Sequence, residues 1–174
     1  IKAFKFHSVS QVKNTILKSA GETYRLPLLS KSFTITVNRQ EVKPTDPMFL
    51  KVPLEKKYGE VLDKKTHDVT WVDENGKERE SSFTITYVKV PEPIGPEDNI
   101  RASNSGVWVM RNNRQIVSST RFKNLPGSIS YVSVSLAHRF RALVEFNDDL
   151  DWYFNLNVWK TEVHPCEAFF NQIR

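Results

Sequence analysis

Hydrophobic and polar residues alternate along several segments of this chain in the two-residue period of a half-buried β-strand. Strands are therefore predicted at five places: residues 33–37, 68–72, 82–90, 131–136 and 140–146. Asn75-Gly76 separates the second of these from the third, and it is the strongest short signal for a hairpin because both positions tolerate a positive φ. The pattern predicts one long hairpin over 68–90.

A second hairpin is predicted around Asn112-Asn113, where short apolar segments lie on either side of a polar turn. Arg111 and Arg114 flank this turn. Two interpretations of them stay open: a pair of exposed turn arginines, or a contact with nucleic-acid phosphate or with an acidic partner surface. Along 140–146 the alternation places Arg141 on the solvent face.

Near the N-terminus the apolar residues change to a helical spacing of three or four. Ser8-x-x-Gln11 has the form of a capping box, and the pattern predicts an amphipathic helix over 8–24. A second helix is expected from Glu167, shortly after Pro165. Residues 51–67 are rich in charge and poor in apolar periodicity, so we expect an exposed connection there.

The order helix, strand, two hairpins, strands and helix predicts an α+β fold, with mostly antiparallel pairing and helices on one face of the sheet. A chain of 174 residues with 39% hydrophobic and 26% charged residues has the size of one globular domain, and we expect a single domain over 1–174. Because the chain opens mid-pattern without a methionine, we expect it to be a fragment of a longer protein.

Charge and cysteine content narrow the possible chemistry. The net charge of +5 allows an anionic partner, although the excess is spread along the chain. The single cysteine, Cys166, excludes an internal disulfide, and no cluster of His and Cys predicts a metal site. No apolar run approaches the roughly 18 residues that cross a bilayer. We expect no membrane partner and a reduced compartment, cytoplasmic or, in a eukaryote, nuclear.

The segment 143–165 carries the candidate chemistry. Apolar residues alternate with polar ones over 154–158, which predicts a strand that ends just before Lys160. A lysine at such a point can reach out of the sheet, and an ordinary surface lysine is the alternative. Three acids of the preceding turn are expected to be solvated: Asp148, Asp149 and Asp151.

Two motifs in this half of the chain resemble a known family. They are the hairpin Gly106-Val-Trp-Val-Met-Arg111-Asn-Asn-Arg114-Gln-Ile116 and the run Leu150-Asp151-x-x-Phe154-x-Leu-x-Val158-x-Lys160-x-x-Val163-x-Pro165. The pair looks like the second, or transducer, domain of the GHKL ATPases, the superfamily of gyrase B, MutL, the MORC proteins and related heat-shock chaperones. Residues 106–165 carry the specific resemblance, and the segment between Lys123 and Arg139 is longer and less patterned than the family would suggest.

The resemblance implies a fold like the second domain of a small-subunit ribosomal protein, and a role for one lysine. In the family, a loop lysine of the transducer enters the neighbouring ATP-binding domain and contacts the γ-phosphate; here it would be Lys160. The Asp-x-Gly-x-Gly motif that binds adenine in the family is absent from this sequence. ATP and Mg²⁺ would therefore be bound by an upstream domain, and this chain alone would not hydrolyse ATP.

The implied partners are that ATP-binding domain, a second copy in a homodimer, and DNA. Two other functions stay open. The chain could be a nucleic-acid-binding module, whose affinity would fall steeply with salt. It could also be a structural interaction domain. The residues that would serve nucleic-acid binding are Arg111, Arg114, Arg121 and Lys123.

Overall fold

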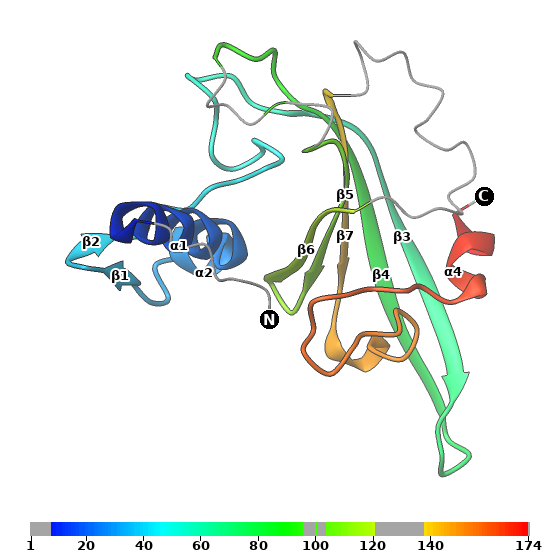
Figure 1. Ribbon diagram of the computed structural model, residues 1–174. Helices are drawn as coiled ribbons and strands as arrows, with labels where there is room; N and C mark the ends of the chain where they lie inside the picture. Colours follow the sequence, from blue (N-terminus) through cyan, green and yellow to red (C-terminus); the bar gives the residue numbers. More distant parts are fainter. Residues whose placement is uncertain (1–7, 96–99, 101–103, 121–137, 174) are drawn as a thin grey trace, which may run out of the picture. The chain divides into compact units, whose positions relative to one another are not determined.

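The computed structural model describes residues 8–95, 100, 104–120 and 138–173 (Figure 1). The predicted strand at 131–136, together with Arg121 and Lys123, lies outside these residues. The chain divides into two compact units, Ile1–Pro47 and Met48–Arg174, which are described separately. The expectation of one domain over the whole chain stays a prediction.

The first unit holds helices α1 (Val9–Thr23) and α2 (Arg25–Leu29) and a small hairpin of β1 (Thr36–Val37) and β2 (Gln40–Glu41). The capping box is confirmed: the Ser8 hydroxyl accepts from the backbone N–H of Gln11 at 3.2 Å, and the Gln11 side chain accepts from the N–H of Ser8 at 2.9 Å. Of the strand predicted at 33–37, only its last two residues pair.

The second unit is built on a five-stranded sheet in the order β3-β4-β7-β5-β6 (Figure 1). Its strands are β3 (Glu60–Val72), β4 (Glu78–Lys89), β5 (Gly106–Arg111), β6 (Arg114–Thr120) and β7 (Phe140–Phe146). The α+β class is confirmed. The sheet is mixed rather than mostly antiparallel, because β5 and β7 run parallel in its centre. Local patterns do not reveal this pairing, which joins strands distant in the sequence.

Both predicted hairpins are present. β3 and β4 form the long one, and Val72 pairs with Glu78 next to the Asn75-Gly76 turn. β5 and β6 form the second, with Asn112 and Asn113 at φ values of 47° and 64°. The expected connection at 51–67 is wrong from Glu60 onward, since those residues belong to β3. β3 is an edge strand, and exposed charged side chains are usual on such edges, which is why its first half shows no apolar pattern.

One face of the sheet carries the main core. Helix α4 (Glu167–Gln172) and the 3-10 helix η4 (Asp148–Leu150) contribute Phe169 and Leu150 to it. The segment between η4 and α4 contributes Tyr153, Phe154 and Val163. The strands contribute Val69, Phe83, Ile85, Val107, Val109, Ala142, Val144 and Phe146. Because successive side chains of a strand point to opposite faces, every second residue of these strands lies on the face that the chain covers after β7.

The other face of β7 is also covered, which corrects the placement of Arg141. Its side chain is only 2% exposed instead of solvated. Its guanidinium lies 4.9 Å from the ring centre of Trp108 and 5.6 Å from that of Phe49, within reach of cation–π attraction. Trp108 of β5 and Phe49 from the segment before β3 thus help to cover this side chain on the second face of the sheet.

Candidate functional site

The chain turns back across the core after β7, and it does so without a strand. The backbone N–H of Phe154 donates to the carbonyl of Leu150, and that of Leu156 donates to Asp151, both at 3.1 Å. Asn155 takes a φ of 43°, which turns the backbone out of an extended path. The predicted strand at 154–158 is therefore wrong, and the apolar alternation that suggested it has another cause.

That cause is a change of burial along the segment, from Phe154 in the core through the partly buried Leu156 to two exposed residues. Phe154 is fully buried and stacks on Phe146 with ring centres 3.9 Å apart. Val158 is 88% exposed and Trp159 is 82% exposed. The segment is thus held to the core at one end and presents two apolar side chains to solvent at the other.

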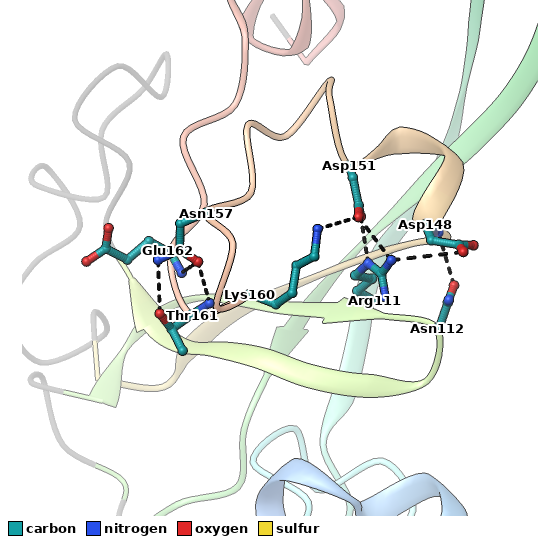
Figure 2. A network of polar contacts seen from close by, with 8 residues as sticks. All are labelled: Arg111, Asn112, Asp148, Asp151, Asn157, Lys160, Thr161 and Glu162. Carbon is teal, nitrogen blue, oxygen red and sulfur yellow. Dashed lines mark hydrogen bonds and ion pairs between the residues drawn. The ribbon is translucent and has the colours of Figure 1, made fainter.

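Asn157 closes the exposed end of this segment into an ordered turn (Figure 2). Its side-chain oxygen accepts hydrogen bonds from the backbone N–H groups of Thr161 at 2.8 Å and Glu162 at 3.4 Å. Its backbone carbonyl accepts from the N–H of Lys160 at 2.9 Å. Lys160 occupies the left-handed region with a φ of 54°. We call residues 155–162 the Lys160 loop.

Lys160 points from this loop to Asp151, where it meets Arg111 of β5 (Figure 2). The Lys160 ammonium nitrogen lies 2.7 Å from Oδ2 of Asp151. Arg111 donates to both carboxylate oxygens, through Nε at 2.6 Å and Nη2 at 2.9 Å. Asp151 thus accepts a two-pronged contact from the arginine and a single contact from the lysine.

The three side chains are partly shielded from water. The exposed fractions are 35% for Lys160, 24% for Asp151 and 23% for Arg111. Partial burial acts to raise the pKa of Asp151, but the hydrogen bonds from Arg111 and Lys160 outweigh it and hold that pKa below its ordinary value. The hydrogen bond to Asp151 in turn raises the pKa of Arg111. The carboxylate stays charged at neutral pH. Its partial burial and its two ion pairs correct the expectation that Asp151 is merely solvated.

The neighbouring turn residues complete the site. Asp148 lies 4.0 Å from the Arg111 guanidinium, and its backbone N–H donates to the side-chain oxygen of Asn112 at 3.1 Å (Figure 2). The β5–β6 turn and the turn after β7 are thereby joined. Arg111 is accordingly half-buried and ion-paired rather than an exposed turn arginine, whereas Arg114, opposite it at the start of β6, is exposed.

The structure thus brings together two of the predicted site residues, Lys160 and Arg111, through Asp151, which the sequence predicts to be solvated. The signal for Asp151 was present, because Leu150-Asp151 belongs to the run that carries the family resemblance. The role of Asn157 had no signal in the sequence. A nucleic-acid role for Arg111 and Arg114 stays a prediction.

In the part of the chain that the structure describes, no group of three or more His, Cys, Asp and Glu side chains could hold a metal ion. No helix there has the length and apolar character needed to span a membrane. Compared with known proteins, the sequence matches no protein-family model and no curated protein.

Proposed function

We propose that this chain is the transducer domain of a GHKL-type ATPase, and that Lys160 contacts the γ-phosphate of ATP held with Mg²⁺ in a preceding domain. One observation supports this most strongly. An ordered loop presents Lys160, itself partly exposed, beside two exposed apolar residues, Val158 and Trp159. The family resemblance at 106–165 singles out the same lysine.

The loop has the two properties that insertion into a neighbouring domain requires. Exposed large apolar side chains gain free energy when another surface covers them, and tryptophan is among the residues that contribute most at interfaces. Val158 and Trp159 would supply that contact. The Asn157 turn fixes the backbone in advance, which lowers the entropy lost on docking.

Lys160 would act by charge. As the bond to the γ-phosphate breaks, negative charge grows on the phosphoryl oxygens, and an ammonium held in a site closed to water stabilises it without proton transfer. Because the lysine belongs to a different domain from the nucleotide, hydrolysis becomes coupled to the distance between the domains. The transducer would in this way relay the nucleotide state to a partner subunit or to bound DNA.

The test is steady-state ATP hydrolysis by the full-length protein. Lys160→Ala is expected to lower kcat about 10²–10³-fold, the loss typical when one preorganised donor to a developing charge is removed. ATP affinity should change far less. Lys160→Arg should restore only part of the rate, since a planar guanidinium does not occupy the point of an ammonium. Lys64→Ala, at an exposed lysine of β3, is the matched control.

Unchanged turnover in a folded Lys160→Ala variant would refute the proposal. The exposed Val158 and Trp159 would then favour the second candidate, a protein-interaction module without a part in ATP hydrolysis. In that case Trp159→Ala would weaken partner binding while ATP hydrolysis by the full-length protein stayed the same. Arg111 supports the nucleic-acid-binding alternative only weakly, because its guanidinium already donates two hydrogen bonds to Asp151.

A further inference from the structure

The three charged groups around Asp151 are held unequally. Arg111 makes two hydrogen bonds to the carboxylate, with one nitrogen on each oxygen. Lys160 makes one, at 2.7 Å to Oδ2, and it is the more exposed of the two cations. The oxygen that Lys160 uses also accepts from Arg111 at 2.9 Å. Lys160 is therefore the member of the cluster that can leave with the least loss.

We propose that the Asp151–Arg111 pair is a resting site for the Lys160 ammonium, which we call the seat. Lys160 leaves the seat when its ammonium exchanges the Asp151 carboxylate for a phosphoryl oxygen of ATP. The inference rests on the proposed function and adds to it a competing anion within the chain itself. Asp151 is then a positioning residue that holds the lysine when no nucleotide is near. It does not touch the nucleotide.

Arg111 makes this exchange possible. A partly buried carboxylate that loses its only cation is left with an unpaired charge, which is costly. After Lys160 leaves, Asp151 still accepts both hydrogen bonds from Arg111, so the carboxylate stays paired. The Lys160 backbone stays fixed by Asn157 during the same step. The exchange therefore needs only rotation of the flexible lysine side chain.

The seat makes ATP hydrolysis slower than the unrestrained lysine would allow. Partly exposed ion pairs of this kind shift an equilibrium by about two- to fivefold. In the full-length protein, Asp151→Asn is therefore expected to raise kcat/KM for ATP by about that factor, because the lysine no longer has a competing carboxylate. Asp151→Glu keeps the charge and should restore a value near that of the original protein.

Two further variants separate this seat from a purely structural role. Arg111→Lys removes the two-pronged contact, makes Asp151 depend more on Lys160, and should lower kcat/KM about two- to fivefold. Asp149→Asn is the matched control: this acid is an exposed residue of the same turn, and no change is expected. In the Lys160→Ala background, Asp151→Asn should produce no increase, since the effect passes through the lysine.

A fall in kcat/KM for folded Asp151→Asn, or an increase that persists in the Lys160→Ala background, would refute the inference that Asp151 competes with ATP for Lys160. If Asp151→Asn does not fold, Arg111→Lys decides alone, and an unchanged or raised kcat/KM would contradict the inference. Failure of the proposed function gives a different result, because Lys160→Ala by itself would then leave turnover intact.

Discussion

Replacing Phe154 by alanine tests how the Lys160 loop is attached to the rest of the unit. Phe154 is fully buried and lies against four other aromatic rings, one of which is its chain neighbour Tyr153 at 5.5 Å. Its ring centre is 3.9 Å from that of Phe146, 5.6 Å from Phe83 and 5.4 Å from Phe169. No side chain of the Lys160 loop enters the described core as deeply as Phe154 does, so this ring fixes where the loop begins.

The expected loss is large for one substitution. A buried phenylalanine removes roughly 150 Å² or more of surface from water, which at about 25 cal/mol per Å² is about 4 kcal/mol. Phenylalanine-to-alanine changes in well-packed cores cost about 3–5 kcal/mol, which agrees with this value. We therefore expect Phe154→Ala to lower the free energy of unfolding by about 3–5 kcal/mol in urea denaturation followed by circular dichroism.

Trp159→Ala serves as the control, because that side chain is equally aromatic but 82% exposed. Its unfolding free energy should lie within about 0.5 kcal/mol of the original value. If Phe154→Ala cost less than about 1 kcal/mol, Phe154 would not be the anchor of this segment and the described path of the chain after β7 would be wrong.

Two other features give predictions of their own. The pKa of Asp151 is held below its ordinary 3.8, so its ion pairs with Arg111 and Lys160 contribute stability that is fully present above pH 3.8 and lost as the pH falls through the lowered pKa. The urea midpoint of the original protein should therefore drop with acid more steeply than that of Asp151→Asn. Equal slopes for the two proteins would contradict the shift. Asn113 has a φ of 64°, so Asn113→Val should cost about 1–2 kcal/mol while Asn113→Gly stays near neutral, and a neutral valine variant in the same urea assay would refute the turn geometry.

Features set by neighbouring residues could be predicted from the sequence. The Ser8 and Gln11 capping box forms as expected, because both partners lie within one helical turn. The Asn75-Gly76 and Asn112-Asn113 hairpins form because their residues tolerate a positive φ. In each case the physical cause lies within a few residues of the signal.

Features set by distant packing could not. Arg141 is buried because both faces of β7 are covered, and no pattern within the strand reveals the second cover. The residues at 154–158 alternate like a strand, yet Asn155 bends the backbone, and none of the strands that the structure describes pairs with them. Asp151 resembled any solvated turn acid until the fold brought Arg111, forty positions away in the chain, onto its carboxylate.

The most direct test of the central claim is chemical labelling of the lysine nearest the γ-phosphate. An ATP analogue that carries an acyl group on its γ-phosphate transfers that group to an adjacent amine, and mass spectrometry of the digested full-length protein identifies the labelled residue. We predict acylation of Lys160, suppressed by excess ATP and far above that of the exposed control Lys64. Equal labelling of the two lysines, or labelling of Lys160 that excess ATP does not suppress, would contradict the claim.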